Sequence, residues 1–360
     1  NFWQATPLPN GAAGTLGGLA YRSLYPNAVL DLFAPIPAET GLPEPLVARL
    51  RAIGAAFDTR PFRASTPSFR HFESEELGVC RLSGAFPAFS ITGGACALNC
   101  KHCRAEILKP MLHAGPPDTF EARVRGMIAR QGLSGFLMSG GSNLNNEVSF
   151  DRYLPAIARL KADHPALRIL AHTGLVDARR ARSLKEAGVD VAMLDIIGAE
   201  ATIREVYNLH RPVTDFEASL AHLVAAGLEV IPHIVIGLHF GRLLGERAAL
   251  DIIARHPTRA AILVVVMPAF ADAVFVGPDP VAVAEFFAEA RDRLKSRELL
   301  LGCARPHGPA RVTLDSAAVF AGFDGIAYPS DEAVRIARDL GRPFSHERTC
   351  CGASSCTAAA

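Results

Sequence analysis

The sequence lacks the features that would place it in a membrane or on a nucleic acid. None of its apolar stretches reaches the roughly 18 residues that a membrane-spanning helix needs. The formal net charge is only +1, and the sequence has neither a long basic run nor an alternation of aromatic residues with Lys and Arg. Proteins that bind nucleic acid usually present such basic surfaces. We therefore expect neither a membrane nor a nucleic acid as a partner.

A secretory signal is also missing. The first residues read NFWQATPLPNGAAG and lack the basic-then-apolar pattern of a signal peptide, and because they lack a starting Met we expect that the chain has been trimmed. Disulfide bonds are rare in proteins that stay inside the cell, so the eight cysteines favour metal binding or catalysis. We expect a cytoplasmic protein with one large α/β domain and an extension.

Three cysteines, Cys96, Cys100 and Cys103, lie close together in one predicted loop. Their C-x3-C-x2-C spacing follows a short apolar run at 86–91 that is typical of a buried strand. Three thiolates after a strand favour a [4Fe-4S] cluster with one iron left open for another ligand. A zinc site is the alternative, although zinc sites usually pair two short Cys or His units and no second unit lies nearby. His102, inside the loop, is expected to pack over the cluster or to face solvent.

From residue 86 the chain alternates short apolar strands with helices, which is typical of parallel β/α units. The strand count fits an α/β fold of the (β/α)8 TIM-barrel type, closed or incompletely closed, with a doubly wound sheet as the alternative. We expect an N-terminal arm and helical leader over 1–85, the barrel over 86–341 and a cysteine-containing C-terminal tail over 342–360. The predicted strands are 87–92, 135–139, 168–172, 189–195, 229–236, 260–267, 298–303 and 325–328. The predicted helices are 45–57, 118–131, 149–164, 177–187, 200–208, 214–226, 243–256, 279–296, 315–321 and 330–340.

In barrels of this kind the chemistry sits at the C-terminal ends of the strands. The residues that can carry chemistry follow this rule, which predicts an enzyme. Asp195 ends an apolar strand and is expected to hydrogen-bond a ribose or a polar substrate group, because a buried carboxylate needs a partner. His233 is expected to face the interior, as a satisfied core histidine or as a substrate contact. The other residues at strand ends are Gly140, Gly141, Ser142, His172, Gly237 and Cys303.

A second group of cysteines comprises Cys303 and three tail residues, Cys350, Cys351 and Cys356. A tail can fold back over a barrel mouth, so this group could hold an auxiliary iron–sulfur cluster. A zinc site, a soft-ligand site for a thiophilic substrate, and a tail with free thiols are the alternatives. Arg305, close to Cys303, could bind a carboxylate or act as an unusual cluster ligand.

Several stretches together resemble the radical S-adenosylmethionine (SAM) superfamily, in its biotin-synthase-like branch, which includes the two-component lipoyl synthases. The similarity covers roughly residues 65 to 356. The stretches that carry it are Phe89–Cys103, Ser139–Ser142, His172–Val176, Pro232–Leu238 and Leu301–Pro306 followed by Cys350-Cys351.

The resemblance implies a cofactor site. The three loop cysteines would hold a [4Fe-4S] cluster whose open iron binds the methionine part of SAM. Relatives often carry Gly-Gly-Glu where this chain has Gly140-Gly141-Ser142, so the backbone contact to the amino group of SAM can persist while the carboxylate contact is lost. The segment around Gly237 would contact the adenine. His172 and Asp195 would also contact SAM, and Arg204 could bind its carboxylate.

The resemblance also implies a reaction. A 5′-deoxyadenosyl radical would abstract hydrogen from an unactivated carbon. Sulfur from a sacrificial auxiliary cluster would then be inserted at that carbon. The partners would be a flavodoxin- or ferredoxin-type electron donor, a lipoyl-carrier protein and a second synthase subunit. The alternatives are carbon-skeleton rearrangement, metallocofactor maturation or another group transfer without sulfur insertion, and a non-enzymatic iron–sulfur carrier.

Overall fold

The structure, a computed structural model, describes residues 40–68, 71–80 and 85–353. Its main element is an eleven-stranded sheet in the order β13-β1-β12-β11-β10-β9-β8-β7-β6-β4-β5, in which every pairing is parallel. The strands are β1 Phe62–Ser65, β4 Ala88–Ser90, β5 Leu112–His113, β6 Gly135–Ser139, β7 Arg168–His172, β8 Val191–Asp195, β9 Glu229–Ile236, β10 Ala260–Val265, β11 Glu298–Leu301, β12 Gly325–Ala327 and β13 Phe344–Glu347. A separate antiparallel hairpin pairs β2 (Phe72–Ser74) with β3 (Gly78–Cys80).

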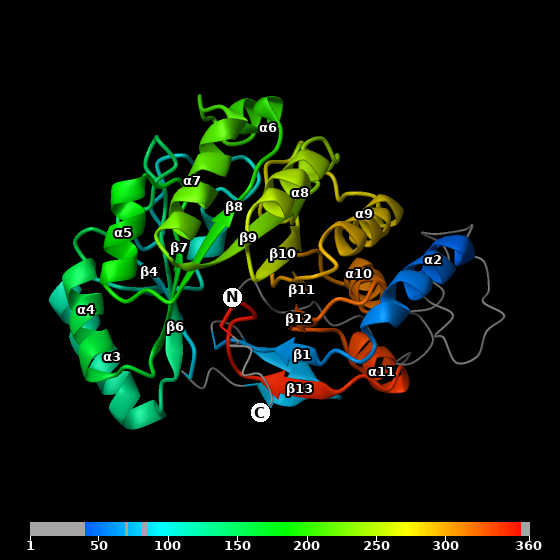
Figure 1. Ribbon diagram of the computed structural model, residues 1–360, viewed down its shortest axis with the longest axis horizontal. Helices are drawn as coiled ribbons and strands as arrows, with labels where there is room; N and C mark the ends of the chain where they lie inside the picture. The colour runs from blue at the N-terminus through cyan, green and yellow to red at the C-terminus, as the bar shows by residue number, and fades with distance from the viewer. Residues whose placement is uncertain (1–39, 69–70, 81–84, 354–360) are drawn as a thin grey trace, which may run out of the picture.

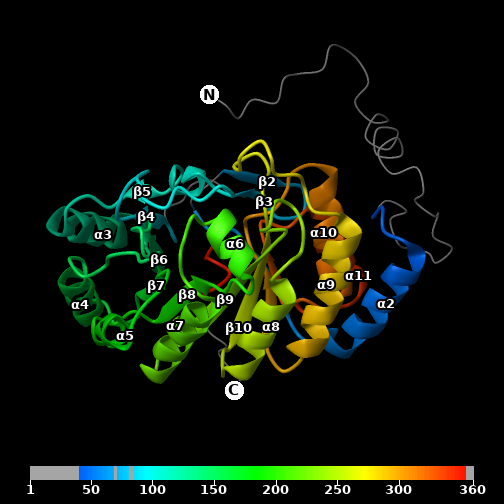
Figure 2. The ribbon, with the colours of Figure 1, turned by 90° about the horizontal axis from the view of Figure 1, so that it is seen from above.

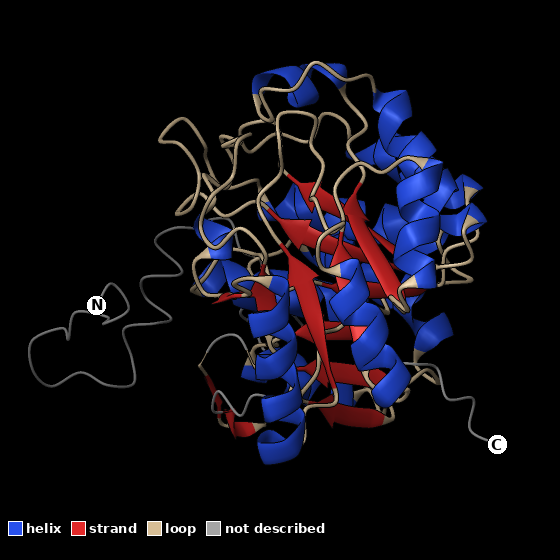
Figure 3. Ribbon diagram, turned by 90° about the vertical axis from the view of Figure 1, so that its left-hand side faces the viewer, coloured by secondary structure: helices blue, strands red, loops and turns tan. Residues whose placement is uncertain are grey.

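All eight predicted strands are confirmed, and they occupy neighbouring positions from β4 to β12. The sheet curls so that one face becomes an interior, but β13 and β5 remain its two edges (Figures 1 and 3). The incompletely closed form of the predicted barrel is therefore the observed one. Full closure is wrong, because the strand order ends at two separate edges.

Two strands extend the sheet beyond β12. β1 comes from the segment predicted as leader, and β13 comes from the segment predicted as tail. β1 pairs with β12 on one side and with β13 on the other, so one sheet crosses both predicted boundaries, at 85/86 and at 341/342. Phe62 and Ala64 are fully buried and fix β1 on the core.

The α-helices lie on the outer side of the sheet (Figure 1). They are α2 Glu44–Gly54, α3 Pro117–Gln131, α4 Leu154–Asp163, α5 Ala178–Glu186, α6 Glu200–Glu205, α7 Val213–Ala225, α8 Glu246–Arg255, α9 Pro280–Arg293, α10 Pro309–Phe320 and α11 Asp331–Asp339. Short 3-10 turns occur at Ala55–Phe57 and Glu106–Leu108. α10 begins six residues before the predicted helix start at 315, because Pro309 is tolerated in the first turn. α2, from the predicted leader, packs against α9 and α10 (Figure 2). In the described part of the chain, none of the helices has both the length and the apolar character to cross a membrane.

The curled sheet separates two apolar cores. The outer core lies between the sheet and the helices. The inner core fills the concave side with alternate strand residues such as Leu170, Met193 and Ile231. The tail residues Cys350, Cys351 and Ala353 belong to this inner core. Figures 1 and 2 accordingly show the red C-terminal segment in the middle of the curled sheet.

A chain of ion pairs, here called the charged floor, joins residues at the N-terminal ends of the strands. Glu298 pairs with Arg63 at 2.7 Å and with Arg259 at 2.5 Å. Arg259 also pairs, at 2.5 Å, with Glu229. Glu229 in turn pairs with Arg168 at 2.7 Å. The five side chains are 13–26% exposed, so the network is partly shielded from water. The opposite end of the sheet carries the long loops (Figure 3).

Candidate functional site

The cysteine loop follows β4 and is held by backbone contacts. The hydroxyl of Thr92 accepts a hydrogen bond from the Gly141 N–H at 2.7 Å and donates one to the Ala95 carbonyl at 2.8 Å. The Ala97 N–H donates to the Ser142 carbonyl at 2.9 Å, and the Lys101 N–H donates to a carbonyl in the α6 region. The loop is therefore tied both to the segment after β6 and to the segment after β8.

Close backbone packing explains the glycine pair after β6. A Cβ atom on Gly141 would lie 1.9 Å from the Ala95 carbonyl oxygen and 2.5 Å from the Cys96 Cα. A Cβ atom on Gly140 would lie 2.7 Å from Ile91. A residue with a side chain cannot occupy position 141 unless the cysteine loop moves, and at position 140 it would displace the Ile91 side chain. The predicted motif is thus part of the support of the cysteine loop.

The three loop thiols form one group. Cys100 is buried, and Cys96 and Cys103 are half-buried. The pKa of Cys100 is raised far above the ordinary range, mainly by burial and to a smaller extent by repulsion from Cys103 and Cys96. Burial, with a contribution from Cys96, raises the pKa of Cys103 to about 11. Cys100 and Cys103, whose ionisation is suppressed, need a strongly positive partner to exist as thiolates, and iron is such a partner. The donor set fits an iron–sulfur cluster.

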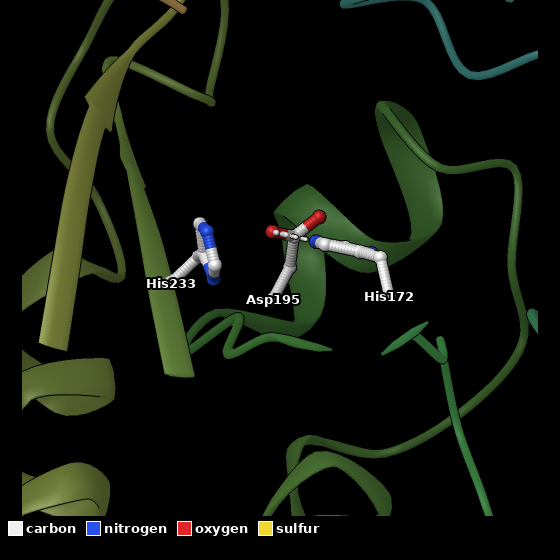
Figure 4. A group of neighbouring side chains, drawn as sticks. All are labelled: His172, Asp195 and His233. Carbon is white, nitrogen blue, oxygen red and sulfur yellow. Dashed lines mark ion pairs between the residues drawn. The ribbon is translucent and has the colours of Figure 1, made fainter. Parts of the chain in front are cut away.

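Next to the loop, His172, Asp195 and His233 converge from the ends of β7 and β8 and from β9. Each offers one ligand atom, and these atoms lie within 4.8 Å of one another. Nε2 of His172 lies 3.7 Å from an Asp195 carboxylate oxygen, and the two imidazole rings have centroids 5.3 Å apart. Figure 4 shows Asp195 between the two rings. The structure thus brings two predicted site residues together with the predicted interior histidine.

Electrostatics set the protonation state of His233. Its Nδ1 lies 3.2 Å from the Ile231 carbonyl oxygen, which can only accept, so Nδ1 carries the proton and Nε2 keeps its lone pair. Burial, followed by the influence of His172, lowers the pKa of His233 to about 4 despite the opposite effect of Asp195. The ring is therefore neutral near pH 7.

Tyr207 links this group to the cysteine loop, and the sequence analysis missed it. Its hydroxyl donates to an Asp195 carboxylate oxygen at 3.3 Å, and its ring stacks on His102 at a centroid distance of 4.9 Å. Burial lowers the pKa of His102 to about 4, and Nδ1 of His102 has no hydrogen-bond partner. The sequence contained no signal for Tyr207, because an isolated Tyr after a short helix is usually a core residue.

Gly237 follows β9 in a left-handed conformation, with φ of 78°. Its N–H donates to the Glu246 carboxylate at 2.8 Å, and the Gly245 N–H donates to the same carboxylate at 3.0 Å. Glu246 is buried, and burial raises the pKa of its carboxyl group, against the effect of these backbone donors. Sequence analysis missed Glu246, which holds the loop that contains Gly237.

Arg204 differs from the other predicted site residues. It lies on α6 with a 59% exposed side chain, 3.7 Å from the Glu205 carboxylate. It is thus on the surface, whereas His172 and Asp195 face the interior. Arg305 is buried and binds the Asp315 carboxylate through two nitrogen atoms, at 2.5 and 3.0 Å. Its guanidinium group is engaged inside the fold.

The second cysteine group assembles in the inner core. Cys350 and Cys351 are buried. The Cys351 thiol donates a hydrogen bond to Cys350, and this bond, with burial and repulsion from Cys350 and Cys303, raises the pKa of Cys351 well above the ordinary range. Gly352, the next residue, packs on Met193 and Ile231. Cys303 is half-buried and packs against the same core, whereas Cys356 lies outside the described residues.

The three groups form layers within the interior. Met193 and Ile231, which contact the tail, precede Asp195 and His233 by two positions on the same strands, so all four share one face of the sheet. Asp195 in turn acts on the pKa of both Cys100 and Cys103. The polar group of His172, Asp195 and His233 therefore lies between the cysteine loop and the tail cysteines.

Comparison with known proteins shows what this arrangement is similar to. Residues 90–243 match the family model described as the Radical SAM superfamily. The biotin synthase of Desulforudis audaxviator (strain MP104C) is 27% identical over 172 residues, which cover 46% of this chain and 49% of that enzyme. The chain thus matches about half the length of this curated relative.

Solved structures share the fold. Methylornithine synthase aligns with a TM-score of 0.53 at 10% identity, over 84% of this chain and 89% of its own. HydG, a maturase of the [FeFe]-hydrogenase, aligns with a TM-score of 0.55 at 12% identity, over 83% of this chain and 68% of its own. The maturase HydG from Carboxydothermus hydrogenoformans aligns with a TM-score of 0.52 at 14% identity, over 83% of this chain and 71% of its own. Residues 90–243 are thus similar to the Radical SAM superfamily, part of the chain is similar to a biotin synthase, and the solved structures share the curled parallel sheet.

Proposed function

We propose that this chain is a radical SAM enzyme and that it inserts sulfur at an unactivated carbon, in the manner of a lipoyl synthase. The observation that carries the proposal is the position of Cys350 and Cys351 in the inner core, close to Cys303 and on the far side of Asp195 from the cysteine loop. A sulfur donor must face the carbon that loses hydrogen. Thiols from the tail and from the end of β11 meet in the same interior that the cysteine loop borders.

The loop cysteines Cys96, Cys100 and Cys103 would hold a [4Fe-4S] cluster. When bound, the cluster and SAM supply a 5′-deoxyadenosyl radical. Gly140, Gly141 and Ser142 would position SAM through backbone groups, because the two glycines bring this segment directly against the cysteine loop. Gly237, held by Glu246, would contact the adenine, and His172 and Asp195 would contact polar groups of SAM.

The chain's own residues then have two tasks. The apolar inner core around Met193 and Ile231 would exclude water from the substrate carbon. Cys303, Cys350, Cys351 and Cys356 would hold an auxiliary iron–sulfur cluster as the source of sulfur. Each new carbon–sulfur bond replaces one carbon–hydrogen bond and consumes one SAM molecule. The insertion of two sulfur atoms therefore needs two SAM molecules. Arg204 would bind the SAM carboxylate only if α6 turns its exposed side chain inward.

Iron and acid-labile sulfide in anaerobically purified protein test the proposal. We expect about eight irons per chain, falling to about four when Cys350, Cys351 and Cys356 are replaced by Ala. About four irons in both proteins would rule out the auxiliary cluster. Reductive formation of 5′-deoxyadenosine should persist in the triple variant, because the loop cysteines are intact.

The same variant separates the alternatives. If the enzyme rearranges a carbon skeleton, matures a metallocofactor or transfers another group, the tail cysteines should be dispensable for product formation. A protein that only carries a cluster would form no 5′-deoxyadenosine. We further propose a flavodoxin- or ferredoxin-type electron donor, a lipoyl-carrier protein and a second synthase subunit as partners, in the cytoplasm.

A further inference from the structure

We propose that His172, Asp195 and His233 bind one divalent transition-metal ion, separate from the iron held by cysteines. Two imidazoles and one carboxylate on one side of an ion form a donor set that suits iron(II), zinc and manganese. The inference does not depend on sulfur insertion.

The distances fit a single ion. Ligand atoms about 2.0–2.2 Å from one ion lie about 3–4 Å from one another. The distance of 3.7 Å from His172 Nε2 to the Asp195 oxygen falls in this range. All three ligand atoms lie within 4.8 Å of one another, so rotation of the side chains would draw the group together around an ion. At 3.7 Å the two groups are too far apart to hydrogen-bond, so they face each other across a space that an ion could fill.

The surroundings have the form of a second coordination shell. Metal-binding histidines usually donate their other N–H to a carbonyl or carboxylate, which fixes the tautomer. His233 does so, since Nδ1 is bound to the Ile231 carbonyl and the Nε2 lone pair remains for a metal. Ligating carboxylates are in turn hydrogen-bonded, and Asp195 accepts from Tyr207 at 3.3 Å. Backbone and side chain thus already orient two of the three ligands.

The site is also accessible. The side chains of His172 and Asp195 are each 28% exposed, whereas His233 is buried behind them. An ion can therefore enter from the interior and keep open coordination positions toward it. Such positions would take an oxygen or nitrogen atom of a bound molecule. Polar groups of SAM would then reach His172 and Asp195 through the bound ion.

Manganese is the appropriate probe, because Mn²⁺ favours oxygen and nitrogen donors over the thiolates elsewhere in the chain. The full chain, purified anaerobically with its iron in the EPR-silent oxidised state, would be titrated with Mn²⁺ and the free Mn²⁺ signal followed by EPR. We expect about one bound Mn²⁺ per chain, with pulsed-EPR couplings to histidine nitrogen.

Variants locate the ion. Asp195→Asn and His233→Leu should weaken Mn²⁺ binding at least about 100-fold, and Tyr207→Phe about 10-fold, as expected for a second-shell contact. His71→Gln, which replaces an exposed histidine paired with Glu73, and the double variant Cys350→Ser/Cys351→Ser should bind as the parent does. Unchanged circular dichroism and iron content would show that the variants fold.

Two results would overturn the proposal. One is the absence of Mn²⁺ uptake up to about millimolar concentration, which would return His172 and Asp195 to direct SAM contacts. The other is uptake that survives Asp195→Asn and His233→Leu, or that disappears with the tail cysteines, because the ion would then lie elsewhere.

Discussion

Gly141 has room for a hydrogen atom where any other residue would place a carbon 1.9 Å from the Ala95 carbonyl oxygen. The atom in the way is backbone, so it cannot swing aside as a side-chain tip could. The cysteine loop itself must move, and the relative positions of its three thiols change with it. At this scale one missing methyl group determines whether the loop can hold its ligands in place.

We predict that Gly141→Ala lowers iron content substantially and destabilises the fold by about 1–3 kcal/mol, the usual cost of overpacking. Gly94→Ala is the matched control, since a Cβ atom there meets nothing within 4 Å. Iron content and thermal unfolding of both variants check this. Equal iron content in the two would contradict it.

Glu246 gives a pH prediction. Burial raises the pKa of its carboxyl group above the unfolded value of 4.5, so the folded protein binds more protons than the unfolded one. The contribution of Glu246 to stability is full below pH 4.5 and is lost as pH rises through the folded pKa. In Glu246→Gln, whose amide oxygen can still accept from Gly237, this loss should disappear.

The measurement is the unfolding midpoint of both proteins at a series of pH values from 4.5 to 8. The difference between them should grow in favour of the variant as pH rises. Parallel curves would show that Glu246 does not change its protonation state on folding.

At the scale of elements, β1 and β13 matter most, because they carry the sheet past the eight strands that the sequence predicts. Periodicity located β4 and β6 to β12, since those strands are apolar runs in a regular strand–helix alternation. It missed β1, a four-residue strand that includes Arg63 and Ser65, and β5, which has only two residues. It also missed β13, in which His346 and Glu347 hide the pattern. β1 and β13 are strands because they pair with segments far away in the sequence. A local sequence pattern contains no information about such pairing.

The same reason limits prediction of the site. The cysteine spacing and the strand ends were enough to predict Cys96, Cys100 and Cys103, and to single out His172 and Asp195. Tyr207 and Glu246 act through contacts whose partners are 12 and 9 positions away, in loops of irregular shape. Arg204 lies on the surface beside Glu205, because helical spacing alone does not show which face of a short helix is buried.

We predict that Phe62→Ala in β1 destabilises the protein by about 3–5 kcal/mol, as for a large aromatic residue removed from a core. Phe62 is fully buried and stacks on Phe344 of β13, so the loss affects two strands. Val274→Ala, at a 64% exposed position, should cost almost nothing. Chemical unfolding of both variants tests this, and a small effect of Phe62→Ala would mean that β1 contributes little.

Across the whole molecule, polar groups lie at the two ends of an apolar interior. The charged floor joins the strands at one end, and His172, Asp195 and His233 lie toward the other. The tail cysteines occupy the apolar layer between them. The floor helps to fix the spacing of strands that are not closed into a full barrel.

We predict that Glu298→Gln, which leaves Arg63 and Arg259 without their shared carboxylate, costs about 1.5–3 kcal/mol, the range for hydrogen bonds to charged groups. Glu289→Gln breaks the more exposed pair with Arg247 and should cost no more than about 1 kcal/mol. Thermal unfolding at low and high salt tests both, because only the exposed pair should weaken strongly with salt. Equal losses would mean that the floor behaves as an ordinary surface network.

The position of β1 also has a consequence for the order in which the chain is made. β1 is among the first strands to leave the ribosome, yet its neighbours in the sheet, β12 and β13, are the last. Roughly 260 residues separate Ser65 from Gly325, which takes on the order of 10–50 s to synthesise. During that time β1 has no sheet partner, while β4 to β11 are synthesised and can pair. Arrival of the last described residues, from β12 onward, then completes both the sheet and its interior in a single late step.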